Sequence, residues 1–549
     1  MLWYLYLLLK ESSINTKSFL IRTILSIKQF NQIDNKIQRS LRDSRKIGIS
    51  FVFMFLASFV AITFSEGNNN IILVFGVFVS AYMAMNIGAN DVANNVGPAV
   101  GSKTMSIVVA IIIAAIFEAG GAIIAGGDVV GTIKSGIVSQ DSFSDPKMFI
   151  ALMMAALIAA AVWLNLATFM RAPVSTTHSI IGGLLGAGLA AGGFGIVNWK
   201  AMISIVASWF ISPVLGGIVA AIFLMIIKRT ITYKSDKIKA SRIVVPILLF
   251  IMSLSFTLYL IQKGLSKIVK LDLYMQFVIA FLIAAIVFGL SKMWVNNKSK
   301  NLSNSKDSVA DLFNIPLICA AALLSFAHGA NDVANAIGPM AAINQALSGV
   351  VASKAHVPIW IMIIGGFGIS LGLALYGPRL IKTVGSEITD IDKIRAFCVA
   401  MSASITVLIA SSLGLPVSST HIAIGAIFGI GFLREYIKNS YKKMQQEIID
   451  AHKGKDAKSI EYFLNNFNQS SLKQKQEILK QLKKDKNLVN AKLNKKDAKI
   501  LRKSLKNDLI KRSMIMKIIA AWLITVPVSA LFGVVAFFVT YQFIKDSVI

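Results

Sequence analysis

Long apolar runs without a single charged residue decide what this chain can fold into. Three of them are Ala201–Ile227, Leu273–Leu290 and Ile518–Tyr541. Each approaches or exceeds the roughly 20 residues that a helix needs to cross about 30 Å of hydrocarbon. Only 15% of the 549 residues are charged, whereas a soluble protein holds about 25%. A soluble enzyme and a disordered scaffold are therefore excluded, and the sequence predicts an all-α polytopic membrane protein.

The apolar segments predict 12 or 13 transmembrane helices, the count depending on two interrupted segments. The candidate spans are residues 48–65, 71–87, 105–126, 149–170, 178–195, 201–227, 244–262, 273–290, 312–328, 357–378, 396–412, 416–433 and 518–541.

The basic residues are concentrated in three segments, 1–47, 228–242 and 434–517, which together supply +25 of the net charge of +29. Lys and Arg near the ends of spans mark the cytoplasmic side. If residues 1–47 lie inside and the spans alternate, all three segments fall on that side. We therefore expect a bilayer-embedded protein with its N-terminus inside. The Lys- and Ile-rich composition suggests a bacterial source, and hence the cytoplasmic (inner) membrane of a bacterium. A nucleic-acid partner is not expected.

Two motifs occur twice. Gly88–Pro98 returns as Gly329–Pro339 with 9 of 11 residues identical, and Pro173–His178 returns as Pro416–His421 with 5 of 6 identical. The offsets, 241 and 243 residues, indicate a duplicated unit of about 240 residues. On the topology above, the first motif follows a span that runs inward and its copy follows one that runs outward. This predicts two inverted repeats with broken or re-entrant helices at the centre, and alternating access to a central site.

The repeats divide the chain into seven parts. They are a basic cytoplasmic N-terminal extension (1–47), an additional span and loop (48–70), a first transport repeat (71–227), a basic linker with connecting spans (228–311), a second transport repeat (312–433), a basic cytoplasmic loop (434–517) and a final span with the C-terminus (518–549).

The first motif offers oxygen ligands for a small cation. In Gly-Ala-Asn-Asp-Val-Ala-Asn the two Asn residues share a helix face, and Gly88 and Gly97-Pro98 can break the helix and free backbone carbonyls. A lone Asp in mid-membrane costs about 2.5–3.5 kcal/mol, so a cation or proton, Na⁺ or H⁺, is expected at Asp91 and Asp332. Helix capping is the alternative role. The candidate cation and coupling residues are Asn90, Asp91, Asn94, Asn331, Asp332 and Asn335.

The second motif, Pro-Val-Ser-x-Thr-His, predicts a helix start inside the membrane. Proline is favoured in the first helical turn, and the N–H groups of a helix N-terminus attract anions. Hydroxyl groups from both copies could surround one tetrahedral oxyanion, although capping alone remains an alternative. The candidate anion-binding residues are Ser175, Thr176, Thr177, Ser418, Ser419 and Thr420.

Three further side chains are candidates for coupling. His178 and His421 end the second motif and could relay protons or bind phosphate, or could be satisfied by a carbonyl. Glu118 is a carboxyl group within the apolar run 105–126 and has no acidic counterpart in the other half. It is a candidate for coupling or gating, or a group that pairs with a neighbouring helix.

The paired motifs resemble those of the inorganic phosphate transporter family of cation-coupled symporters. The resemblance covers roughly residues 71–433 and a final span at 518–541. It implies an inverted-repeat fold of about 12 spans, often dimeric, which imports phosphate across the cytoplasmic membrane by symport with Na⁺ or H⁺. It also implies that the Asp, Asn and hydroxyl residues of both motifs line the site, with no enzymatic activity and no cofactor besides the coupling cation. The basic N-terminal extension with the extra span 48–65 is less typical of the family, as is the loop 434–517.

Three other functions fit parts of the pattern. A sulfate permease on the same fold is the closest, but acceptors such as Asp91 and Asp332 near the anion favour phosphate, whose hydroxyl can donate. An intramembrane hydrolase could use Ser175, His178 and an Asp, although a duplicated nucleophile has no obvious purpose there. A phosphate sensor signalling through residues 434–517 would not need inverted halves.

Overall fold

The computed structural model describes residues 43–64, 71–170, 174–267, 269–348, 357–387, 392–450, 466 and 512–546. Within these ranges the chain is helical, and its β pairing is confined to one antiparallel bridge between Val138 and Val197. Most of the N-terminal extension 1–47 and of the loop 434–517 lies outside the described residues.

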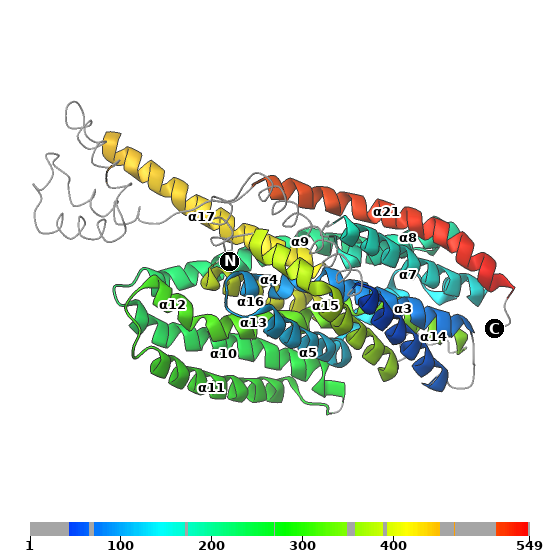
Figure 1. Cartoon of the computed structure of the whole chain (residues 1–549), viewed down its shortest axis with the longest axis horizontal. Helices are drawn as coiled ribbons and strands as arrows, with labels where there is room; N and C mark the ends of the chain where they lie inside the picture. The colour runs from blue at the N-terminus through cyan, green and yellow to red at the C-terminus, as the bar shows by residue number, and fades with distance from the viewer. Residues whose placement is uncertain are drawn as a thin grey trace, which may run out of the picture.

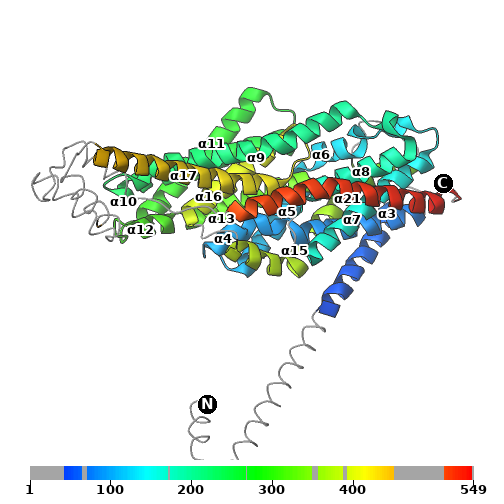
Figure 2. The same ribbon diagram turned by 90° about the horizontal axis from the view of Figure 1, so that it is seen from above.

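The helices form one bundle and run mostly along its long axis (Figures 1 and 2). They begin with Asp43–Phe64 and continue as α3 (Ile71–Asn90), α4 (Val92–Gly101), α5 (Ile107–Ala125), α6 (Gly127–Gly131), α7 (Pro146–Phe169), α8 (Thr176–Gly192), α9 (Trp199–Ile227), α10 (Lys237–Lys263), α11 (Leu273–Lys298), α12 (Lys306–Leu312), α13 (Asn314–Asp332), α14 (Ala334–Leu347), α15 (Ile359–Glu387), α16 (Lys393–Ser412), α17 (Ser419–Asp450) and α21 (Arg512–Lys545). The short helices η1 (Thr132–Gly136), η2 (Gln140–Ser142), η3 (Phe194–Ile196), η4 (Lys228–Thr232) and η5 (Leu265–Lys267) join them.

Within the described residues, 11 helical segments are long and apolar enough to cross a membrane. They correspond to 11 of the 13 spans predicted from the sequence, which confirms a helical, multi-pass membrane protein. The other two predicted spans, 178–195 and 416–433, are helices α8 and α17. Both begin inside the second motif.

The outer faces of the bundle are apolar, as lipid contact requires. Helix α11 lies at one edge beside α10 (Figure 1), and only 11% of its apolar window is buried. Its side chains Phe277, Phe281 and Ile286 are exposed. In water such a face would be unstable, whereas the hydrocarbon core of a bilayer covers it without cost.

Both copies of the Gly-Ala-Asn-Asp motif lie where a long helix is interrupted. The first break falls at Asp91, between α3 and α4, and the second at Val333, between α13 and α14. The expectation that Gly97-Pro98 breaks the helix is wrong, because α4 continues through Pro98 to Gly101. A proline removes only one backbone hydrogen bond, and the packing of α4 against α15 supports the turns around it.

Gly88 does not break α3 either, and it allows a close helix crossing instead. A Cβ atom at Gly88 would lie 1.8 Å from the carbonyl oxygen of Ile369 in α15. In the second copy, a Cβ atom at Gly329 would lie 2.1 Å from the carbonyl oxygen of Glu118 in α5. The motif helix of each half therefore packs against a helix of the other half.

The helix that starts in the second motif of each half also packs against a helix from the other half. A Cβ atom at Gly186 of α8 would lie 2.0 Å from the carbonyl oxygen of Ala530 in α21, and one at Gly429 of α17 would lie 2.0 Å from that of Gly217 in α9. Thus α21 packs on the second-motif helix of the first half, and α9 packs on that of the second. These matched, exchanged contacts are the three-dimensional counterpart of the sequence duplication.

Candidate functional site

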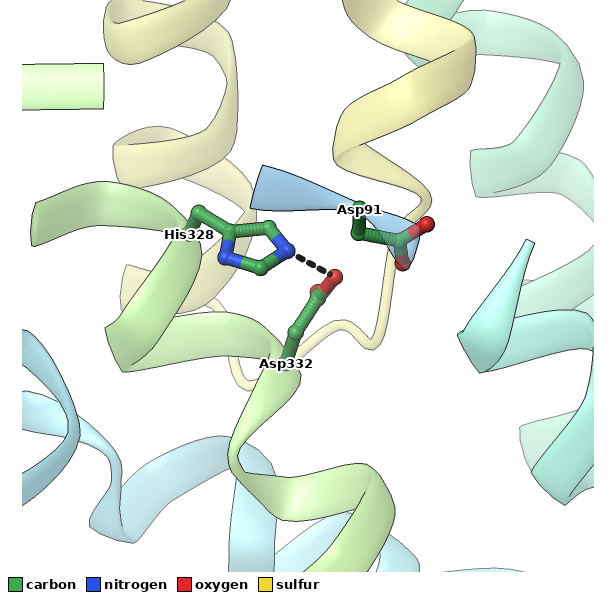
Figure 3. Close-up of side chains that lie close together, drawn as sticks. All are labelled: Asp91, His328 and Asp332. Carbon is green, nitrogen blue, oxygen red and sulfur yellow. Dashed lines mark ion pairs between the residues drawn. The ribbon is translucent and has the colours of Figure 1, made fainter. Parts of the chain in front are cut away.

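The two helix breaks bring the predicted aspartates together in the interior of the bundle. Asp91 and Asp332 are only 2% and 1% exposed. Figure 3 shows Asp91 beside an imidazole–carboxylate pair formed by His328 and Asp332, in which Nε2 and Oδ2 lie 2.8 Å apart. His328 precedes Asp332 by one helical turn of α13. One carboxyl group from each half therefore faces the same small buried region.

Helices α8 and α17 start next to these carboxyl groups. Ser175 caps α8 by accepting a hydrogen bond from the backbone N–H of His178 at 3.2 Å, and Ser418 caps α17 by accepting one from that of His421 at 3.3 Å. Each helix begins one residue after its serine, and so Pro416 lies before the helix and not in its first turn. Ser175 and Ser418 thus have the capping role that was the alternative to anion binding.

The next hydroxyl in each motif binds an aspartate. Thr176 Oγ1 donates to Asp91 Oδ2 at 2.7 Å. At the equivalent position of the other half, Ser419 Oγ donates to Asp332 Oδ2 at 3.3 Å. The two motifs of each half are therefore in direct contact.

The third hydroxyl of each second motif accepts a hydrogen bond from an asparagine of the other half. Asn94 Nδ2 donates to Thr420 Oγ1 at 2.9 Å, and its counterpart Asn335 Nδ2 donates to Thr177 Oγ1 at 3.2 Å. Thr420 Oγ1 also donates to Asp91 Oδ1 at 3.3 Å. Residues predicted from both motifs of both halves thus form one hydrogen-bonded cluster.

The first asparagine of each motif contacts backbone before the motif helices. Asn90 Nδ2 donates to the carbonyl oxygen of Val174 at 3.4 Å, and Asn331 Nδ2 donates to that of Leu415 at 3.1 Å. Asn331 Oδ1 also accepts from the backbone N–H of Val417 at 3.2 Å. These side chains position the segments that lead into α8 and α17.

Glu118 is fully buried and lies beside the same cluster. Its Oε2 is 2.6 Å from His328 Nδ1, and its Oε1 accepts from Asn95 Nδ2 at 2.8 Å. It pairs with a neighbouring helix, which was the alternative to a coupling role, and that helix carries Asp332. A chain of contacts therefore leads from Asn95 through Glu118 and His328 to Asp332.

Two members of this chain, His328 and Asn95, were not among the residues predicted from sequence. His328 had a usable signal, because an ionisable residue in an apolar span one turn before Asp332 is itself a candidate functional group. Asn95 had none, since its importance depends on Glu118, which a different helix brings to it.

His178 and His421 lie against each other where the two motif helices meet. Their ring centroids are 4.6 Å apart, and His178 also meets the indole of Trp209 edge-on at 3.9 Å. Both histidines are buried. They contact each other across the halves.

The cluster has the chemistry of a site for both a cation and an anion. Three buried carboxyl groups face one imidazole, which leaves an excess of negative charge for a cation when the acids are ionised. Hydroxyl groups at two helix N-termini supply donors suited to an oxyanion.

Comparison with known proteins agrees with this chemistry. Residues 87–533 match the model of the phosphate transporter family, PHO4. The chain belongs to this family. The family consists of transporters and not of enzymes, and its matched range includes both copies of both motifs. Phosphate transport across a membrane is therefore the general activity of the chain.

Individual relatives cover most of the molecule. A Helicobacter pylori protein (strain ATCC 700392 / 26695) named "Putative phosphate permease" is 52% identical over 94% of this chain and 98% of its own length. The Thermococcus kodakarensis protein "Putative phosphate permease TK2061" is 39% identical over 69% of this chain and 92% of its own. A solved structure titled "The sodium-dependent phosphate transporter" superposes with a TM-score of 0.69 at 31% identity, covering 85% of this chain and 98% of the other.

Proposed function

We propose that the chain imports inorganic phosphate by symport with Na⁺, through a site formed by both halves at Asp91 and Asp332. The observation that carries this proposal is the direct hydrogen bonding between these carboxyl groups and hydroxyls of the second motif. The sodium dependence named for the similar solved structure supports Na⁺ over H⁺ as the coupling cation. Asp, Asn and hydroxyl oxygens are also the hard ligands that such a cation prefers.

The hydrogen bonds suggest how cation and anion binding are coupled. A hydroxyl group has only one proton to donate, and Thr176 donates it to Asp91 at 2.7 Å. A cation bound at Asp91 would take over this carboxylate oxygen and release the hydroxyl to donate to phosphate. The same argument applies to Ser419 and Asp332. Phosphate would then bind well only after the cation, as symport requires.

The exchanged packing of the two halves supports a mechanism of alternating access. We propose that they are inverted in the membrane and that the exchanged helix pairs rock about the central cluster. The basic segments support an N-terminus on the inside, and we propose a bacterial inner membrane as the location. A homodimer is a further expectation from the family, and it is tested by the mass of the purified protein in detergent.

The deciding experiment measures uptake of radiolabelled phosphate into proteoliposomes. Imposed Na⁺ and proton gradients are applied separately, and sulfate is added as a competitor. We expect uptake driven by the Na⁺ gradient and insensitive to sulfate. Uptake driven only by the proton gradient would overturn Na⁺ coupling, and strong inhibition by sulfate would favour a sulfate permease.

Site variants test the residues. Asp91→Asn and Asp332→Asn should abolish Na⁺-driven uptake while the protein still reaches the membrane, because each removes the charge that holds the cation. Asp141→Asn is the control, since this aspartate is exposed and far from the cluster in sequence. Normal uptake by both site variants would refute the assignment.

A further inference from the structure

The two halves of the site differ in one ligand. His328 directly precedes the glycine of the second motif, and the residue at the same position of the first is Ile87. A cation near Asp332 therefore meets an imidazole nitrogen, which the first half does not offer. Alkali cations gain little from such a nitrogen, whereas divalent transition metals bind it strongly.

The geometry of this half suits a metal ion. One ligand atom each from Asp91, His328 and Asp332 lies within 4.8 Å of the others, and all three residues are buried. Among the residues that the structure describes, no other group of His, Cys, Asp or Glu comes together in this way. His328 Nε2 and Asp332 Oδ2 are 2.8 Å apart as an ion pair, and they would separate to about 3.4 Å as two tetrahedral ligands that are each about 2.0–2.2 Å from one Zn²⁺.

The surroundings of His328 have the pattern found behind metal-binding histidines. Such a histidine usually gives its other ring nitrogen to a carboxylate, which fixes the orientation of the ring. Here Nδ1 lies 2.6 Å from Glu118 Oε2, and Asn95 holds Glu118 in turn. Nε2 is thereby aimed at the space between the two aspartates.

A second observation points to a ligand site at the same place. Asp332 Oδ1 has no hydrogen-bond partner among the described residues, although Asp332 is only 1% exposed. Buried carboxylate oxygens normally have partners. A cation between Asp332 and Asp91 would satisfy this oxygen.

We propose that Asp91, His328 and Asp332 bind a divalent transition metal ion of the Zn²⁺ type, which inhibits transport by occupying the carboxylates needed by the coupling cation. Two carboxylates and one imidazole form a ligand set typical of such ions, with a position left for water or an anion. Binding of the metal follows from these residues alone. Inhibition rests on the function proposed above.

Binding is tested by titrating Zn²⁺ into the purified full-length protein in Na⁺-free, phosphate-free buffer, followed by calorimetry. We expect a high-affinity site that His328→Gln removes or weakens at least about tenfold, because Gln cannot replace the imidazole ligand. Glu118→Gln should weaken binding about 10- to 100-fold, as loss of a partner behind the ligand does. Asp141→Asn changes an exposed carboxylate; it is the control and should bind Zn²⁺ as the wild type does.

A spectroscopic probe keeps the test valid if a variant is less stable. Co²⁺ bound at the wild-type site should show visible absorption bands that depend on His328, and Zn²⁺ should displace it. Absence of Zn²⁺ binding by the wild type, or unchanged affinity in folded His328→Gln protein, would overturn the proposal.

Transport assays separate this inference from the proposed function. Zn²⁺ should inhibit Na⁺-driven phosphate uptake, and raising Na⁺ should relieve the inhibition, since both ions need Asp91 and Asp332. Uptake that is insensitive to Zn²⁺ would refute the inhibitory role while leaving symport intact. Zn²⁺ binding by a protein that takes up no phosphate would support the metal site and refute symport.

Discussion

The crossing of α5 and α13 at Gly329 gives a sharp test of the site's architecture. In Gly329→Ala the new Cβ atom would lie 2.1 Å from the carbonyl oxygen of Glu118, and ordinary contact begins at 3.4 Å. The helices must therefore separate by about 1.3 Å at this point. The adjacent contact between Glu118 and His328, now 2.6 Å, would lengthen to as much as about 3.9 Å, beyond hydrogen-bond range.

This separation should be costly for both stability and transport. Overpacking alone lowers the stability of a protein by about 1–3 kcal/mol. Removing one partner of a buried ion pair costs about 3–5 kcal/mol, and we take this as the upper limit of the stability loss in Gly329→Ala. We expect a clearly lower unfolding temperature in detergent and a loss of phosphate uptake for Gly329→Ala.

Gly120→Ala is the matched control on α5. A Cβ atom there would lie 4.0 Å from the ring of Phe326, which is ordinary contact, and alanine favours a helix by about 1 kcal/mol over glycine. This variant should be as stable as the wild type or more so. If Gly329→Ala also kept normal stability and uptake, the close crossing and its role in placing His328 would be wrong.

Two hydroxyl groups give further predictions. Thr420→Val removes a donor to Asp91 and the acceptor for Asn94, and a hydrogen bond to a charged group is worth about 1.5–3 kcal/mol. The half-saturating phosphate concentration in uptake assays should therefore rise about tenfold or more, and an unchanged value would assign Thr420 a packing role only. Thr132→Val removes the 2.6 Å hydrogen bond to the carbonyl oxygen of Gly414, which precedes the second motif. A loss of about 0.5–1.5 kcal/mol should raise the same concentration by about two- to tenfold, whereas a change in the amount of folded protein alone would contradict a positioning role.

The sequence predicted the helical membrane fold because its main signal is local. Runs such as Leu273–Leu290 identify themselves by length and lack of charge, and α11 indeed covers this run. The motif copies also indicated where the helices are interrupted, although the breaks lie at Asp91 and Val333 and not at the Gly-Pro pair. A local rule for proline fails where neighbouring helices supply the missing support.

The contacts between distant residues could not be predicted in this way. The sequence nominated Thr177 and Asn335 separately, but their hydrogen bond depends on how the halves exchange helices. For the same reason Glu118 was recognised as an isolated intramembrane acid without its partner His328, which lies 210 residues further along the chain. Which side chains pair depends on how the helices pack. A single sequence can therefore show the candidate residues but not which of them contact each other.

The two halves are similar enough to form one shared site, but they differ in some side chains, so the site is not symmetric. The carbonyl oxygens of Glu118 and Ile369 occupy equivalent places against Gly329 and Gly88. The crossing of α5 with α13 therefore carries a buried acid–imidazole contact. The crossing of α15 with α3 has isoleucines at the matching positions, Ile369 and Ile87. If the halves are inverted as proposed above, identical halves would give inward- and outward-open states of equal energy. On the alternating-access mechanism proposed above, a polar contact at only one crossing would favour the state that keeps this contact intact, and a cation bound at Asp332 would act on the same contact.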